Sequence, residues 1–165
     1  MELNDEIRIK APVSVVYAAL NDPAVLMACI PGCEELIRCN NTELEAKVTL
    51  KIGPMKARFS GTVTLDTAGA PHRFSITGVG NGGIAGFAKG GADVVLEADG
   101  VATKLKYLAT ADIGGKMAQL GSRLVQSTAS KLSGQFFARF VEIVELGSET
   151  MTRRSRDEVG EKTEF

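Results

Sequence analysis

The chain of 165 residues contains no tryptophan, one histidine and only three cysteines. Its other aromatic residues are two tyrosines and seven phenylalanines, and no basic patch interleaves with them. Proteins that bind single-stranded nucleic acid need stacking platforms beside basic residues, so this composition argues against that class. The net charge of −1 likewise gives no reason to expect a nucleic-acid partner.

Long apolar runs are also missing. The longest charge-free stretch, residues 74–88, is interrupted by glycines, whereas a bilayer-spanning helix needs about 18 consecutive apolar residues. The N-terminal residues 1–5 lack the basic and apolar regions of a signal peptide. An odd number of cysteines fits reduced thiols. We therefore expect a cytoplasmic protein, and leave open peripheral contact with the inner face of the membrane.

Residues for catalysis or metal binding are scarce. His72 follows Pro71 in a predicted turn, and without a second histidine any Ser-His or Cys-His chemistry would rest on it alone. Cys29 and Cys33 are separated by three residues, but zinc would need two further soft ligands, and only Cys39 and His72 remain. We expect no catalytic residue, no metal and no cofactor.

Strict alternation of apolar and polar residues fills the middle of the chain. Between residues 46 and 66 the apolar positions are Ala46, Val48, Leu50, Ile52, Met55, Ala57, Phe59, Val63 and Leu65. Lysine, arginine, serine and threonine occupy most of the positions between them. A period of two residues is typical of an antiparallel sheet that is covered on one face.

The period changes to that of an amphipathic helix between about residues 116 and 146. The recurring residues are Met117, Leu120, Leu124, Thr128, Leu132, Phe136, Phe140 and Ile143. At about 1.5 Å per residue this helix would be about 45 Å long, and it is the only predicted element long enough to cover the sheet. One helix rarely fills the space beneath a wide curved sheet, so we expect a cavity.

The remaining elements follow from turn residues and shorter patterns. We predict a first strand over residues 2–10, two short helices ending near residues 20 and 28, and further strands at about 33–40, 43–52, 55–66, 73–80, 86–98 and 101–113. The fold class is therefore α+β, with a domain over residues 1–146. Residues 147–165 are polar, lack an apolar face, and are predicted to form a tail or a solvated helical extension.

The shared apolar pattern of sheet and helix predicts which side chains face the cavity. The candidates are Phe59, Val63, Phe74, Ile76, Phe87, Val94, Leu96, Leu105, Tyr107, Leu120, Leu124, Leu132 and Phe136. Residues 78–86 are rich in glycine, but the strand predicted after them does not fit a phosphate-binding loop. We interpret them as a flexible hairpin that gates the cavity through Gly80, Gly82, Gly83 and Gly86.

The order of elements resembles the helix-grip fold of the START-like, or SRPBCC, superfamily. Three stretches identify a family within this superfamily. They are residues 28–34, 51–61 and 86–90, with the sequences ACIPGCE, KIGPMKARFSG and GFAKG. Together they are similar to the CoxG family of carbon monoxide dehydrogenase subunits, over about residues 1–146. The resemblance implies a seven-stranded antiparallel sheet around the long helix.

The resemblance also implies a function. CoxG proteins are non-catalytic accessory proteins of molybdenum hydroxylases, implicated in attaching the enzyme to the membrane and linking it to quinones. We therefore expect an apolar ligand such as a lipid or quinone, and a molybdenum hydroxylase as partner. The charged tail lacks the hydrophobic anchor that members often carry. Two alternatives stay open: a small START-like enzyme of the cyclase or hydrolase type, and a docking scaffold with a filled core.

Overall fold

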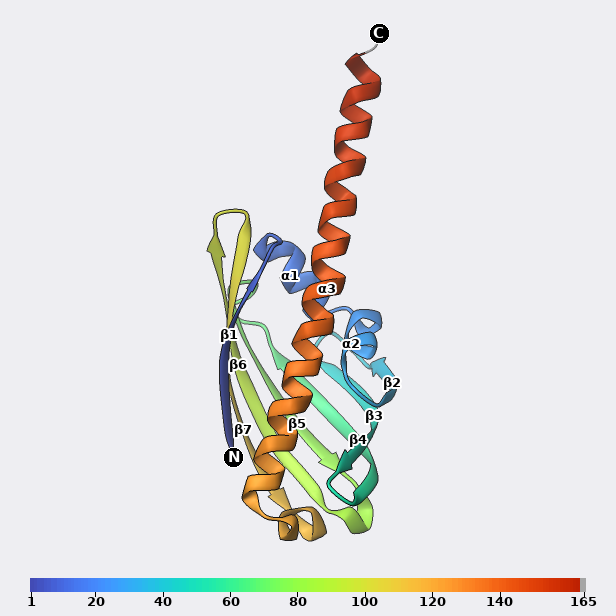
Figure 1. Cartoon of the computed structure of the whole chain (residues 1–165), viewed down its shortest axis with the longest axis vertical. Coiled ribbons are helices and arrows are strands. Elements are labelled where there is room, and N and C mark those ends of the chain that lie inside the picture. Colours follow the sequence, from blue (N-terminus) through green and yellow to red (C-terminus); the bar gives the residue numbers. More distant parts are fainter. Residues whose placement is uncertain (164–165) are drawn as a thin grey trace.

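A seven-stranded antiparallel sheet curves around one long helix in the computed structural model of the chain (Figure 1). The structure describes the backbone of residues 1–163 and the side chains of residues 1–148. The strands are β1 (Glu2–Ile9), β2 (Cys33–Arg38), β3 (Glu43–Ile52), β4 (Met55–Asp66), β5 (Arg73–Asn81), β6 (Phe87–Asp99) and β7 (Ala102–Gly114). The helices are α1 (Val13–Leu20), α2 (Pro23–Cys29) and α3 (Ser122–Thr163). Each predicted strand is present, and the predicted fold class is confirmed.

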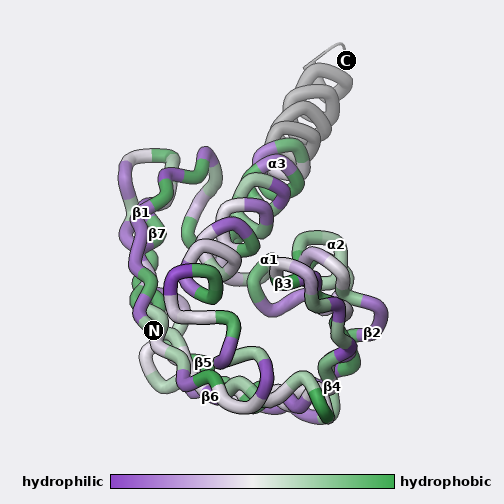
Figure 2. Tube along the Cα trace, turned by 60° about the horizontal axis from the view of Figure 1, so that its bottom comes forward, coloured by the Kyte–Doolittle hydropathy of each residue, from purple (hydrophilic) through white to green (hydrophobic). Residues whose placement is uncertain are grey.

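The strand order is β1-β7-β6-β5-β4-β3-β2, a meander from β2 to β7 that β1 completes by pairing with β7. Short turns join the strands of the meander, as expected for antiparallel neighbours. Viewed from the lower end, the sheet bends around the start of α3 while α1 and α2 lie beside it (Figure 2). One face of the sheet is therefore concave and covered by helices, and the other faces outward.

Local sequence signals explain where the short helices begin. The Asp22 carboxylate accepts a hydrogen bond from the backbone N–H of Ala24 at 2.9 Å, and Pro23 occupies the first position of α2. Both features are typical of helix N-termini, because the cap satisfies a free N–H and proline needs none. Pro12 precedes α1 with an extended backbone and separates it from β1.

The long helix starts six residues later than the sequence predicts. Residues 115–120 form a short 3-10 helix, η2, and α3 begins at Ser122. Between them Gly121 has a φ of +97°, a conformation that other residues rarely adopt. This glycine redirects the chain from the end of the sheet onto its concave face. At its other end α3 extends past residue 146 to Thr163.

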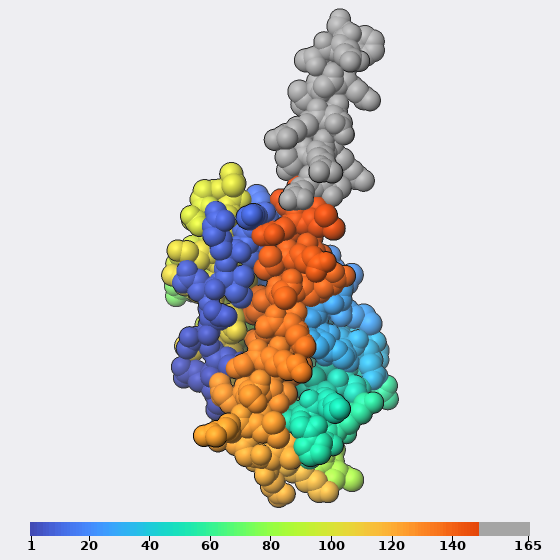
Figure 3. All heavy atoms as spheres, viewed as in Figure 1, coloured from blue at the N-terminus to red at the C-terminus, as the bar shows by residue number. Residues whose placement is uncertain are grey.

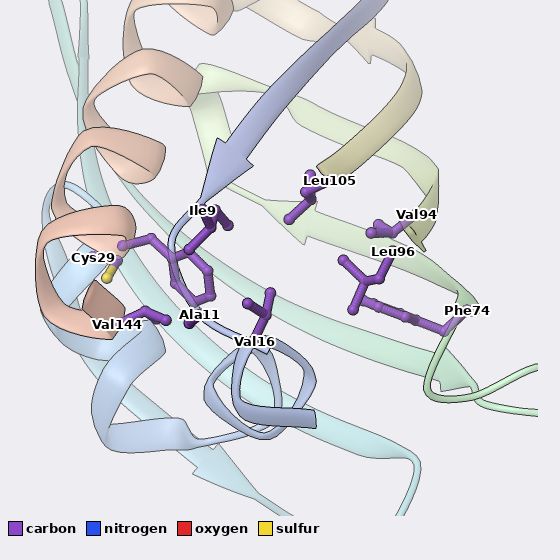
Figure 4. Packing of buried hydrophobic residues seen from close by; sticks show 10 residues of the cluster. Ile9, Ala11, Val16, Cys29, Phe74, Val94, Leu96, Leu105 and Val144 are labelled. Carbon is purple, nitrogen blue, oxygen red and sulfur yellow. The ribbon is translucent and has the colours of Figure 1, made fainter. Parts of the chain in front are cut away.

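Two hydrophobic cores hold the helices against the sheet. The main core joins α1, α2 and the middle of α3 to β1, β5, β6 and β7 (Figure 4). Ile9, Leu105 and Phe140 in it are fully buried. A smaller second core at the lower end contains Ile52, Phe59 and Met117. The two clusters share no residue, so the helices are packed against the sheet at two separate places.

Candidate functional site

A cavity of about 450 Å³ lies between the concave face of the sheet and the first turns of α3. Its sheet side is formed by β3 to β7, and its helix side by Val125, Thr128, Ala129 and Leu132. None of the main-core residues lines it, whereas Ile52, Phe59 and Met117 of the second core do. The volume is within the range of about 300–1,000 Å³ that small-molecule sites occupy.

Small residues on the concave face leave this space empty. Ala46 of β3 pairs with Gly61 of β4, and Gly61 pairs with Gly80 of β5. One step along the strands, Gly78 pairs with Gly90, which in turn pairs with Ala111. These six residues line the cavity and carry at most a methyl group. Where large apolar side chains occupy the same face, further along the strands, the main core is packed instead.

The space in front of Gly80 is the clearest example. A Cβ atom placed on Gly80 would have no heavy atom within 4 Å, and the backbone there needs no positive φ. At Gly61 a Cβ would instead come within 2.9 Å of the Val79 carbonyl oxygen. Gly80 is therefore open toward the cavity, while Gly61 also serves close packing of the strands.

Polar groups are almost absent from the inner wall. Thr128 is the polar side chain that α3 contributes, and its hydroxyl already donates a hydrogen bond to the Leu124 carbonyl at 2.8 Å. Thr62, Lys89 and Thr110 also border the cavity, but they are exposed and alternate with inward-facing neighbours. Among the described residues, no buried side-chain nitrogen or oxygen lacks a hydrogen-bond partner. The wall therefore suits an apolar molecule.

Aromatic side chains of β7 and α3 pack in and against the main core, and none of them lines the cavity. Tyr107 stacks on Phe137 with ring centroids 5.1 Å apart, and Phe136 stacks on Phe140 at 5.8 Å. The Tyr107 hydroxyl lies 3.1 Å from the Ser133 hydroxyl, close enough for a hydrogen bond in either direction. This pair satisfies the polar end of Tyr107 within the aromatic cluster, so Tyr107 offers the cavity no free hydroxyl.

The structure places only some of the predicted cavity residues at the cavity itself. Phe59, Val63 and Leu132 line the cavity. Packed in or against the main core are Phe74, Val94, Leu96, Leu105, Tyr107 and Phe136. Leu120 and Leu124 pack against the second core, and Ile76 lies on the concave face between its register partners Leu65 and Ala92. The small residues at the centre of the wall are not among the predicted cavity residues. Their inward positions in the alternating pattern could have identified them.

Phe87 departs from the expectation. Its neighbour Ala88 lines the cavity, so alternation along β6 turns the Phe87 side chain to the outer face, where it is 50 % exposed. Phe87 and Val94 are seven residues apart, an odd separation, and a regular strand cannot place both on one face. The predicted inward position of Phe87 is therefore corrected to an outward one.

The glycine-rich segment is an ordered corner of the fold. Gly80 belongs to β5, and Gly83–Ala85 form a short 3-10 helix, η1. The Gly82 N–H donates to the Gly86 carbonyl at 2.8 Å, and a Cβ on Gly82 would lie 2.5 Å from the Phe59 ring. These contacts close the lower end of the cavity wall. A gating role for Gly80, Gly82, Gly83 and Gly86 would require them to break and stays a prediction.

The residues considered for catalysis or metal binding lie outside the cavity. His72 Nδ1 is 3.3 Å from the Leu96 carbonyl oxygen. Cys29, Cys33 and Cys39 are free thiols, and burial raises the pKa of Cys29 and of Cys33. Among the described residues, no group of three or more His, Cys, Asp or Glu side chains is arranged to hold a metal ion.

A larger groove of about 890 Å³ lies on the outer face of the sheet. Its lining combines the polar side chains of Thr64, Ser75, Asp93 and Asp112 with exposed apolar residues such as Leu108. The groove therefore mixes charged, hydroxyl and apolar groups, whereas the lining of the inner cavity is almost wholly apolar. We therefore regard the apolar inner cavity as the candidate binding site.

Comparison with solved structures identifies the architecture. A conserved protein from Geobacillus kaustophilus is 26% identical with a TM-score of 0.81, over 87% of this chain and 95% of that one. The Zhui aromatase/cyclase from Streptomyces sp. R1128 is 11% identical with a TM-score of 0.65, over 88% and 93% of the two chains. A START superfamily protein from Mycobacterium smegmatis is 12% identical with a TM-score of 0.61, over 91% and 98%. The last two likenesses show the fold alone.

Sequence comparison then assigns the family. A search of curated protein sequences found no match. In the part of the chain that the structure describes, no helix is long and apolar enough to cross a membrane. The family model for the CoxG subunit of carbon monoxide dehydrogenase matches residues 6–145, which contain the whole sheet after its first residues and the cavity-lining part of α3. The chain therefore belongs to the CoxG family and has a START-like fold.

Proposed function

We propose that this protein is a non-catalytic accessory protein that binds an apolar molecule, a lipid or a quinone, in the cavity beneath α3. The observation that carries the proposal is the combination of an empty volume with an apolar wall. The volume of about 450 Å³ is maintained by glycine and alanine at the centre of the sheet. An apolar ligand gains roughly 25 cal/mol for each Å² of apolar surface that it buries, without leaving a polar group of the wall unpaired.

The partner in this proposal is a molybdenum hydroxylase of the carbon monoxide dehydrogenase type, which the family assignment supports. A bound quinone would let the accessory protein link such an enzyme to the quinone pool of a membrane. The reaction itself belongs to the hydroxylase, and this chain contributes binding, orientation and exclusion of water.

The two alternatives differ from this proposal in what the cavity should contain. A docking scaffold needs a filled core, and the open space in front of Gly80 argues against that. A small enzyme of the aromatase/cyclase type needs acids or bases directed at its substrate, whereas the inward side chains of the wall are aliphatic or aromatic apart from Thr128. The similarity to the Streptomyces aromatase/cyclase supports a shared fold only.

Ligand binding is tested by titrating the purified protein with anilinonaphthalene sulfonate, a probe that fluoresces in apolar sites, and displacing it with a short-chain ubiquinone or a fatty acid. We expect saturable binding of one probe per chain and competitive displacement. Absence of saturable binding would refute the proposal. Co-elution with purified carbon monoxide dehydrogenase on size exclusion tests the partner separately.

A further inference from the structure

Three segments meet at the lower end of the molecule and form its tip. They are the β3–β4 hairpin end (residues 50–58), the β5–β6 turn with η1 (residues 81–90) and the region from the end of β7 into α3 (residues 113–124). Their contacts are direct: a Cβ on Gly53 would touch Leu124, a Cβ on Gly82 the Phe59 ring, and a Cβ on Gly86 the Gly114 carbonyl. Figure 3 shows the β3–β4 hairpin, the β5–β6 turn and η2 side by side at this end.

The tip has basic residues but no acidic ones. Its three segments contain Lys51, Lys56, Arg58, Lys89, Lys116 and Arg123, and no aspartate or glutamate. Of these six cations, Arg58 is the only one that forms an ion pair within the described part of the chain, and its partner is Glu34 of β2. Asp112 lies opposite Lys89 in the register, but no ion pair joins the two side chains. By contrast Arg8, Lys104 and Lys106 of the same sheet are each paired with a carboxylate.

One pair of tip lysines is unfavourable for folding. Lys51 and Lys56 are direct register partners at the end of the β3–β4 hairpin, and both are exposed. Like charges directly opposite each other destabilise a hairpin. The arrangement is therefore explained better by an anionic surface that the tip meets than by the stability of the fold.

Large apolar side chains project from the same tip. Ile84 of η1 is 80 % exposed and Phe87 is 50 % exposed. Single exposed apolar residues are ordinary on protein surfaces, but these two lie close together in the tip segment that also carries Lys89. Apolar side chains surrounded by basic ones are the combination that binds the interface of an anionic bilayer.

We propose that the tip docks on an anionic phospholipid bilayer, with Ile84 and Phe87 inserted among the lipids and the five unpaired cations on the headgroups. The second core beneath the tip contains Phe59 and Met117, which also line the cavity. Docking in this orientation places the end wall of the cavity against the membrane. The proposal rests on the proposed function and deepens it, because it names the end of the protein that meets the bilayer from which an apolar ligand is taken up.

The test is sedimentation of the protein with large vesicles of phosphatidylcholine alone or with 30 mol% phosphatidylglycerol, a composition chosen to carry negative charge. We expect binding to the anionic vesicles that weakens as salt is raised, because salt screens exposed charges. Ile84→Glu should lower the partition coefficient at least about tenfold. The triple change Lys51→Glu, Lys56→Glu and Lys116→Glu should lower it about a hundredfold or more, at about fivefold for each lysine.

Val101→Glu is the matched control. Val101 is 86 % exposed in the β6–β7 turn at the opposite end of the sheet, so this variant should bind vesicles as the unmodified protein does. Equal binding to both vesicle types, binding unchanged by the tip substitutions, or an equal loss in Val101→Glu would overturn the proposal. A loss with the lysine changes but none with Ile84→Glu would also overturn it, because the tip would then contact the headgroups by charge alone, without inserted apolar side chains.

Probe binding without vesicles separates this proposal from the proposed function. Ile84→Glu should bind anilinonaphthalene sulfonate with unchanged affinity, because its side chain lies outside the cavity. If the unmodified protein docks on anionic vesicles but binds no probe, the docking surface stands and the ligand-binding function fails. If it binds the probe but no vesicles, the ligand-binding function stands and the docking surface fails.

Discussion

Gly61 of β4 lies directly opposite Gly80 of β5, and neither residue projects a side chain onto the concave face of the sheet. Both line the cavity. Paired glycines cost a sheet stability, because they lose more backbone entropy on folding and bury no side chain. In this sheet their consequence is a volume that α3 covers but does not fill. The binding function that we propose depends on this gap.

Filling the gap should block binding without unfolding the protein. In Gly80→Leu the new side chain enters open space, so we expect the free energy of unfolding to change by no more than about 1 kcal/mol. Affinity for the apolar probe should fall at least about tenfold, which corresponds to about 1.4 kcal/mol. Fluorescence titration and urea denaturation measure the two quantities on the same sample.

The exposed helix glycine Gly134 provides the control for this substitution. A Cβ there also meets no atom within 4 Å, but Gly134 does not line the cavity. Gly134→Ala should raise the free energy of unfolding by about 0.5–1 kcal/mol and leave probe affinity unchanged. Probe affinity that survives Gly80→Leu in a folded protein would place the binding site elsewhere.

A buried hydroxyl joins β7 to the loop after β1. Thr103 is fully buried, and its hydroxyl donates a hydrogen bond to the Ala11 carbonyl at 2.7 Å. Thr103→Val keeps the shape and removes the donor, so the free energy of unfolding should fall by about 1–2 kcal/mol. Thr64→Val, on the exposed face of β4, makes the same change where water replaces the bond and should be nearly neutral. Equal effects in urea denaturation would contradict the assigned role.

The three thiols should differ in their reaction with iodoacetamide. Only the thiolate reacts. Burial raises the pKa of Cys29 and Cys33, and slight desolvation at the surface together with the Glu45 carboxylate raises that of Cys39. Alkylation of each should therefore be slow at pH 8 and accelerate as the pH rises. Exposed Cys39 should react first, and buried Cys29 only after denaturation. Peptide mass spectrometry measures each rate, and rapid labelling of Cys29 in the folded protein would contradict this packing.

Removal of residues 150–165 tests the C-terminal tail. Its basic residues, Arg153, Arg154 and Arg156, are offset by nearby acids, and the segment lacks the apolar stripe of an interfacial helix. These side chains lie outside those that the structure describes. We predict unchanged folding, probe binding and liposome association for the shortened chain. Release from liposomes would identify the tail as an anchor.

The fold could be predicted well from the sequence, because the spacing of apolar residues distinguishes strands from helices clearly. Residues such as Val48, Phe59 and Leu65 alternate regularly enough to define strands and their inward face. The position of the cavity was harder to predict, since large apolar residues such as Leu105 and Phe136 mark where packing is complete. The cavity lies where small residues face inward. Their effect can be seen only once the strand register places Gly61, Gly80 and Ala46 side by side.

The basic tip, like the cavity, can be recognised only once the fold brings distant segments together. Lys51, Lys89 and Lys116 are far apart in the sequence, and each alone resembles an ordinary solvated residue. The start of α3 was misplaced because the helical pattern continues through residues 116–120, while Gly121 interrupts the backbone there. A positive φ at one glycine is a local property that hydrophobic periodicity does not encode.

Native mass spectrometry of the gently purified protein, with solvent extraction of any bound lipid, tests the central claim most directly. The account predicts a population carrying one apolar molecule per chain, which extraction identifies as a lipid or quinone, and its absence from Gly80→Leu purified in the same way. A chain that carries nothing, or that carries the same molecule after Gly80→Leu, would contradict the claim that the cavity beneath α3 is the binding site.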